Sequence, residues 1–187
     1  MYAGECQYDE IAYRMSEQYG ENGTTLLLEE LERVREDETR LRAVLGSLWF
    51  LPPHDPVGMR IILFYLDHAN DFFVMEAIDG LAHLEVTEAH DRVLAHLAHP
   101  SQYVVGAVLR YLRQLFPGEA KPVMYTALRD SRYIVHECAV DEWDVLGDTE
   151  AASLIRPLVN DSHPDVRSAA RWYFESLAYM AEAGGEA

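Results

Sequence analysis

The stretch NDSHPDVRSAARWYFESL, residues 160–177, places turn-forming residues before a long helical pattern with small residues at its centre. Pro164 suits the first turn of a helix, where its missing N–H costs nothing, and Ser162 can cap nearby N–H groups. The stretch therefore predicts a turn followed by an amphipathic helix.

The same arrangement recurs upstream. Val166 has Leu158 eight residues before it and a small residue, Ala169, three residues after it. At steps of 31, 31 and 30 residues toward the N-terminus, a valine recurs with a leucine before it and a small residue or cysteine three positions later. A weaker fifth copy has Val44 with Ser47. We call the four clear positions the marker valines: Val74, Val104, Val135 and Val166.

A fixed period of this length, with helical patterns in both halves, is typical of a solenoid, in which each helix pair buries its apolar side against its neighbours. The sequence predicts an all-α fold, a right-handed α-α superhelix of about five antiparallel helix pairs preceded by an N-terminal helix. The expected helices are 8–19, then 25–36 with 39–51, 57–69 with 72–84, 87–98 with 101–115, 119–129 with 132–146, and 150–160 with 164–182.

No linker is long enough to divide the array, so residues 1–187 are predicted to form one helical-repeat domain. Residues 1–23 would form an N-terminal helix and cap, residues 24–182 the repeats, and residues 183–187 a flexible tail.

The segment LIRPLVNDSHPDVRSAARWYFESL resembles HEAT repeats, particularly the short bacterial kind related to those of phycobilisome lyases. That family pattern has a leucine helix, an Asp-containing turn, a Val-Arg pair and an Ala-Ala pair. The next copy upstream has His136 in place of the arginine, and Val105 and Met75 stand there earlier. The resemblance implies a HEAT-like solenoid with an Asp–Arg ladder in one repeat only. The matching residues are Leu158, Asp161, Pro164, Val166, Arg167, Ala169 and Ala170.

The chain is strongly acidic, with 32 Asp and Glu against 15 Lys and Arg and a net charge of −17. Such a field repels phosphate backbones, and Arg110 with Arg113 is too small a cluster to offset it, so no nucleic-acid partner is expected. A basic protein partner fits this charge better.

The sequence also predicts a cytoplasmic protein without membrane association. Its first 23 residues lack a basic region followed by an apolar one, and no apolar run is long enough to cross a bilayer. Cys6 and Cys138 lie 132 positions apart in no metal-binding or redox spacing, so both are interpreted as reduced, small hydrophobic residues.

HEAT-like arrays imply a concave surface lined by the second helix of each pair. Positions two, six and nine residues after each marker valine share one face beside the buried stripe. Gly80, Gly106 and Ser168 also occupy these positions. The predicted partner-binding ridge consists of Glu76, His83, Arg110, Arg113, Glu137, Asp141, Asp144, Trp172 and Glu175.

Catalysis and metal binding are not expected. The chain has no Gly-rich phosphate loop, nucleophile elbow or HExxH motif. His96 and His99 are spaced to be neighbours on a helix, but a zinc site needs three or four ligands and His90 stands six residues from His96. No cofactor, metal or catalytic residue is therefore predicted.

Three functions are consistent with these features. The favoured one is a non-catalytic scaffold or adaptor with an acidic concave groove, and within that class an inhibitor, such as an immunity protein that covers a basic partner. The alternative, implied by the resemblance, is a bilin-lyase-like chaperone or enzyme. The least favoured is a HEAT-like DNA alkylation glycosylase, which needs a basic face. Oligomeric state and pathway stay open.

Overall fold

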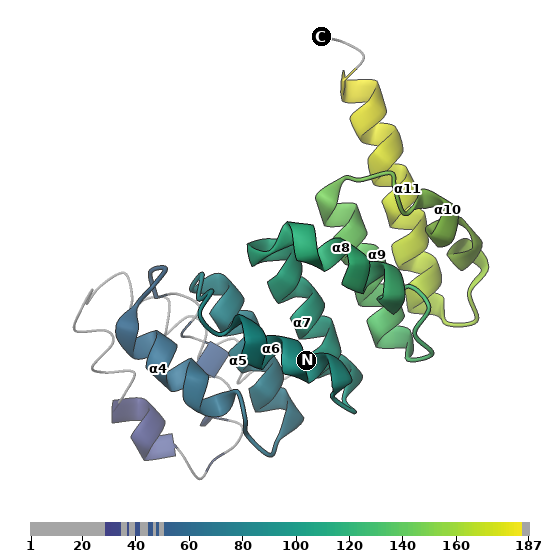
Figure 1. Ribbon diagram of the computed structural model, residues 1–187. Helices are drawn as coiled ribbons and strands as arrows, with labels where there is room; N and C mark the ends of the chain where they lie inside the picture. Colours follow the sequence, from purple (N-terminus) through teal and green to yellow (C-terminus); the bar gives the residue numbers. More distant parts are fainter. Residues whose placement is uncertain are drawn as a thin grey trace. The chain divides into compact units, whose positions relative to one another are not determined.

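The computed structural model describes residues 29–34, 37, 40–41, 45–46, 48 and 51–184, and these contain helices and no β-strand. The all-α prediction is confirmed for this part of the chain (Figure 1). The predicted N-terminal helix 8–19 lies outside the described residues, and so does most of the pair 25–36 and 39–51. No described helix is both long enough and apolar enough to span a bilayer.

The chain divides into two compact units, Met1–His96 and Leu97–Ala187. The first unit includes α4 (Pro56–Tyr65), α5 (Asp71–His83) and α6 (His90–Ala95), and a short 3-10 helix, η2 (His96–Ala98), spans the boundary. The second unit contains α7 (Gln102–Leu115), α8 (Pro117–Ala127), α9 (Tyr133–Leu146), α10 (Ala152–Ile155), the 3-10 helix η3 (Arg156–Asn160) and α11 (Pro164–Gly184).

The four marker valines occupy equivalent places in four helices. Each is the third or fourth residue of α5, α7, α9 or α11, and each is at most 1% exposed. The residue seven positions after each valine is also buried, although its chemistry varies from leucine to tyrosine and glutamate. The repeated sequence positions are therefore repeated structural positions. These residues are Leu81, Tyr111, Glu142 and Tyr173.

The turns before these helices also repeat one hydrogen bond. In each turn a side chain accepts a hydrogen bond from the backbone N–H of the residue two positions later, with 2.8–3.1 Å between the nitrogen and the acceptor atom. Imidazole Nδ1 is the acceptor in the first two turns and a carboxylate oxygen in the last two. This bond fixes the chain direction as each second helix begins. The four acceptors lie 31 residues apart: His68, His99, Asp130 and Asp161.

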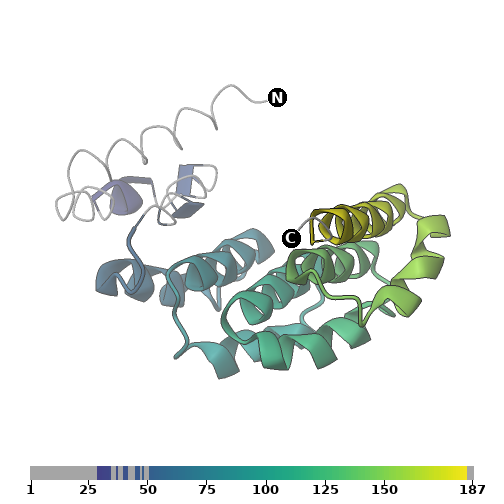
Figure 2. The ribbon, with the colours of Figure 1, turned by 90° about the horizontal axis from the view of Figure 1, so that it is seen from above.

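The second unit has two layers of helices. One layer is formed by α7, α9 and α11, with α9 packed against both neighbours, and the other by α8, α10 and η3 (Figure 2). Its largest buried side chains are Trp143, Tyr111 and Tyr173. Tyr173 closes the core by donating its phenolic O–H to the carbonyl oxygen of Asp148 at 2.6 Å.

Three predicted helices are shorter than the sequence pattern indicated, and the first of them, α4, ends at Tyr65, four residues before the predicted end at 69. The segment 150–160 forms α10 and then continues as the 3-10 helix η3, because Pro157 has no N–H to continue the α-helical ladder. The segment 87–98 likewise gives α6 followed by η2. At the other end, α11 continues to Gly184, two residues past the predicted end of the repeats.

Candidate protein-binding face

The predicted ridge residues are divided between the two units. Glu76 and His83 lie on α5 in the first unit, where His83 is exposed at the helix end. The other seven lie on α7, α9 and α11, the neighbouring helices of the second unit: Arg110, Arg113, Glu137, Asp141, Asp144, Trp172 and Glu175.

The α7–α9 interface depends on a glycine. A Cβ added at Gly106 would lie 2.8 Å from Cys138 Sγ and 3.6 Å from Cys138 Cβ, so the missing side chain lets the two helices approach. Arg110 extends along the same contact, with its Nη1 3.9 Å from the sulfur. Positions two and six after the α7 marker valine thus contact α9.

Position nine on α7 also contacts α9. The Arg113 guanidinium forms an ion pair with Glu142, whose carboxylate is buried while Arg113 is partly exposed. A buried carboxylate without such a partner is strongly unfavourable, so this pair determines how the two helices align. Sequence reasoning missed Glu142, because its position is otherwise apolar and its partner lies 29 residues away.

The α9–α11 interface uses a different face of α9, which includes Asp144. Ser176 Oγ lies 3.3 Å from Asp144 Oδ2, while Asp144 Oδ1 is buried without a partner in the described structure. The predicted ridge therefore differs from a simple solvent-facing row. On α7 and α9, several of its members form the contact with the following helix of the layer.

Four carboxylates crowd on α9, and Asp141 is the exposed one among them. Partial burial by the surrounding protein raises the pKa of Asp141 to about 6, and repulsion from Glu137, Glu142 and Asp144 adds to this, against the opposing effect of Arg110. At Asp141 the effects of burial and of the neighbouring acids together outweigh the effect of Arg110.

Glu137 extends this carboxylate cluster toward α11. Partial burial raises its pKa, and so does Asp165 on α11, while His163 partly offsets both effects. The acidic face therefore continues from α9 to the beginning of α11, where Glu137 and Asp165 repel each other.

Cys138 is interpreted correctly as a small hydrophobic residue. Burial raises the pKa of its thiol to about 12, so it stays protonated at neutral pH and is a poor nucleophile. Cys6 lies outside the described residues.

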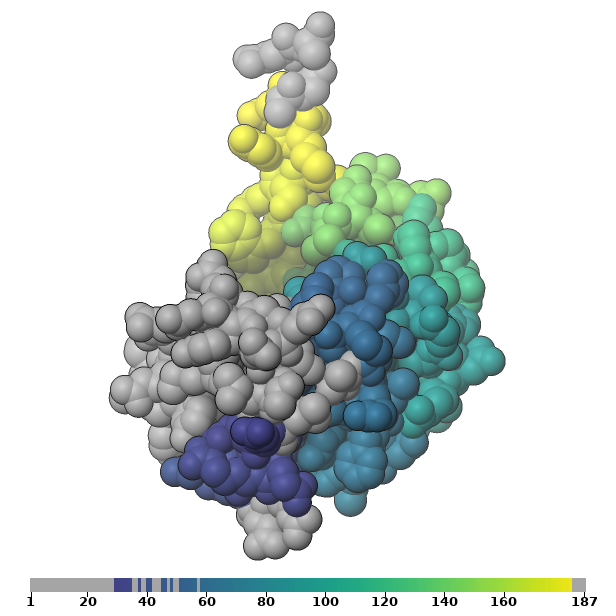
Figure 3. Space-filling model, turned by 90° about the vertical axis from the view of Figure 1, so that its left-hand side faces the viewer, coloured from purple at the N-terminus to yellow at the C-terminus, as the bar shows by residue number. Residues whose placement is uncertain are grey.

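α11 carries the largest exposed aromatic groups of the second unit. Trp172 is 65% exposed and Tyr179 is 74% exposed, and Glu175 is exposed between them. The C-terminal half of α11 projects beyond the neighbouring helices (Figure 3). Tyr179 follows Trp172 by seven positions, or about two helical turns, so the two rings lie on one side of the helix.

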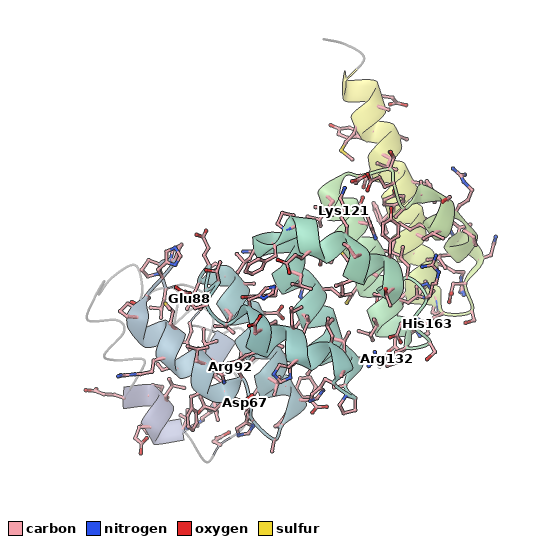
Figure 4. The ribbon with its side chains drawn as sticks, in the orientation of Figure 1. Asp67, Glu88, Arg92, Lys121, Arg132 and His163 are labelled. Atoms are coloured by element: carbon pink, nitrogen blue, oxygen red, sulfur yellow. The ribbon has the colours of Figure 1, made fainter. Side chains whose placement is uncertain are left out.

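The two ends of α9 are fixed by polar contacts that sequence reasoning missed. Arg132 binds both carboxylate oxygens of Asp130, at 2.7 and 2.9 Å, and donates to the carbonyl oxygen of His99 at 3.0 Å. At the opposite end of α9, Lys121 pairs with Asp148 and Glu150 (Figure 4). Asp130 and Lys121 thus stabilise the fold through these ion pairs.

Arg167, the arginine expected to take part in an Asp–Arg ladder, binds backbone carbonyl oxygens. Arg167 Nη1 donates to the carbonyl oxygens of Asp161 and Ser162 at 2.8 and 2.9 Å. His136, at the equivalent position in α9, has Nδ1 3.8 Å from Asp161 Oδ2 and a buried Nε2 without a hydrogen-bond partner. In the described part of the chain, no three His, Cys, Asp or Glu side chains converge as metal ligands.

Comparison with known proteins concerns the fold. No protein-family model matches the chain, and no characterised protein matches it in sequence. A crystal structure of an engineered protein is similar, with a TM-score of 0.59 and 12% sequence identity over 92% of this chain and 88% of the other. At this identity the likeness extends to the fold alone.

The α7–α9 contact predicts a background-dependent effect of Gly106→Ala. The substitution should lower the free energy of unfolding in the natural chain, because the new Cβ meets Cys138 Sγ. With Cys138→Ala, which leaves only the ordinary 3.6 Å contact, it should raise stability by about 0.5–1 kcal/mol through helix propensity. Urea unfolding of the single and double variants measures both effects.

Gly118→Ala is the matched control, because a Cβ there meets nothing within 4 Å. It should stabilise both backgrounds equally. Equal effects of Gly106→Ala in the two backgrounds would contradict the close contact between α7 and α9.

Proposed function

We propose that this chain is a HEAT-like helical-repeat protein that binds a basic segment of a protein partner without catalysing a reaction. The proposed binding face consists of the exposed acidic side of α9, centred on Asp141, and Trp172 on the neighbouring α11. Support for the repeat comes from the equivalent burial of the marker valines and from the hydrogen bond repeated in four turns.

The crowding of exposed Asp141 with three other carboxylates on α9 carries the proposal, and this crowding contributes to the raised pKa of Asp141. Two other carboxylates of the same unit are paired with basic side chains. Asp130 pairs with Arg132 and Asp148 pairs with Lys121, and each pairing lowers the pKa of the carboxylate. Asp141 instead stands among other acids at the surface. A lysine or arginine of the partner would add positive charge to this acidic cluster beyond that of Arg110.

Trp172 on α11 adds an exposed apolar side chain next to the acidic side of α9. Exposed tryptophans contribute disproportionately to protein interfaces, and Trp binds cationic side chains through its ring face. A net charge of −17 would also accelerate encounter with a basic protein. Within this function we favour an inhibitor that covers a basic functional surface, as an immunity protein does.

The proposal predicts that Asp141→Asn stabilises the isolated protein at pH 7. The pKa of Asp141 is raised in the folded state, so the folded chain holds its proton more tightly than the unfolded chain does. Its contribution to stability therefore decreases as pH rises from about 4 to about 6. Thermal unfolding at pH 7 and pH 4.5 should show stabilisation mainly at the higher pH.

Asp130→Asn is the control of opposite sign. The pKa of Asp130 is lowered by Arg132, so this carboxylate stabilises the fold once it is ionised, and the substitution should lower stability at pH 7. Destabilisation by Asp141→Asn at pH 7 would show that the carboxylate has a structural role.

Binding should respond to Asp141→Asn in the opposite direction from stability. With a partner isolated by affinity capture, Asp141→Asn combined with Trp172→Ala should reduce affinity at least tenfold without lowering the melting temperature. Affinity should also decrease as pH falls from 7 to 5, since Asp141 becomes protonated. Unchanged affinity of the double variant, measured by calorimetry, would exclude this face.

A further inference from the structure

Within the second unit, neighbouring helices of one layer meet through the same pair of faces. Positions two, six and nine after the marker valine of α7 contact positions three and seven of α9, through Gly106 and Arg110 on Cys138 and through Arg113 on Glu142. Position nine of α9, Asp144, meets position ten of α11, Ser176. Each helix thus presents one face to the helix before it and another to the helix after it.

α11 has the first of these faces occupied and the second open. Tyr173, at position seven, is fully buried like Glu142 in α9. Positions two, six and nine of α11 are Ser168, Trp172 and Glu175, and all three are exposed. The equivalent Arg113 on α7 retains only 23% exposure of its side chain, because α9 covers it.

We infer that the open face of α11, formed by Ser168, Trp172, Glu175 and Tyr179, docks one amphipathic helix of the protein partner, which packs there as α9 packs on α7. This inference rests on the proposed binding function and specifies the part of the partner that binds. Trp172 and Tyr179 supply the apolar anchor, and Glu175 lies between them.

The existing interfaces specify the chemistry of the incoming helix. Cys138 and Glu142 show that a small residue and a polar residue four positions later face the preceding helix. On α7 the residue that meets Glu142 is an arginine, whereas on α11 the equivalent position carries an acid, Glu175. The docked helix should therefore carry a small residue against Ser168 and beside Trp172, and a lysine or arginine one turn later, toward Glu175.

A second copy of this chain fits the face less well. Each copy would bring a net charge of −17, so self-association would place two strongly acidic surfaces together. Glu175, the acid at position nine, would pair with a positively charged side chain on the docked helix, and this favours a basic partner over a second copy.

A synthetic helix tests the inference on the full chain. The probe is a peptide of residues 131–147 with Cys138→Ala, Glu142→Lys and Trp143→Phe, held helical by a staple joining positions 137 and 141. A control peptide keeps Glu142. Fluorescence anisotropy of the labelled peptides should show binding of the lysine peptide and at least tenfold weaker binding of the control.

Three variants of the protein complete the experiment. Trp172→Ala should weaken binding of the lysine peptide at least tenfold, and Glu175→Lys should reverse the preference between the two peptides. Phe64→Ala, which removes an aromatic ring that is 75% exposed in the other unit, should have no effect. Absent binding, equal affinity for both peptides, or full binding by Trp172→Ala would overturn the inference.

Self-association is measured separately by sedimentation. A dimer that Trp172→Ala abolishes would assign the face to a second copy and would also overturn the inference. The peptide assay reports on α11 alone, whereas the effect of Asp141→Asn on the captured partner reports on the proposed function. Failure of one is therefore distinguishable from failure of the other.

Discussion

The close packing of α7 on α9 is the contact on which the described architecture of the second unit depends. Gly106 lets the helices approach until a Cβ would collide with Cys138, and the Arg113–Glu142 ion pair then determines their alignment. Both contacts join residues about 30 positions apart, so one repeat is completed by the next. Neither helix could bury these groups alone, which is the general condition for a repeat array.

This dependence explains why similar charges behave differently within one helix. Glu142 is buried, but Arg113 compensates its charge, and it therefore belongs to the fold. Asp141 is exposed among other acids; burial and repulsion from these acids raise its pKa, so its ionisation disfavours folding. Retaining a carboxylate at a cost in stability is a common feature of functional surfaces. The proposed binding face follows from this contrast between Glu142 and Asp141.

The repeated core was predictable from sequence because it depends on spacing alone. A valine that recurs every 30 or 31 residues and is followed by a small residue identifies a buried helix face whatever stands around it, and all four marker valines are buried. The repeated turn bond was not predictable in the same way. The acceptor of this hydrogen bond is a histidine at positions 68 and 99 and an aspartate at positions 130 and 161. Because the residue type changes between repeats, the sequence pattern does not reveal the shared bond.

The ridge was predictable only in part. Helical spacing correctly places Arg113 and Asp144 beside the buried stripe, but it does not show that the next helix covers them, because that depends on the distance between helices. Glu142 escaped prediction for the same reason, since its position is apolar in the other repeats. Trp172, which the helical spacing places on the ridge, is 65% exposed.

A double-mutant cycle between Arg113 and Glu142 tests the central contact most directly. Arg113→Met, Glu142→Leu and the double variant are compared with the natural chain by urea unfolding. The packing of α7 on α9 predicts a favourable coupling of roughly 1–3 kcal/mol, with the double variant more stable than Arg113→Met alone. Effects that add to within about 0.5 kcal/mol would contradict the contact between the two helices and the stack built on it.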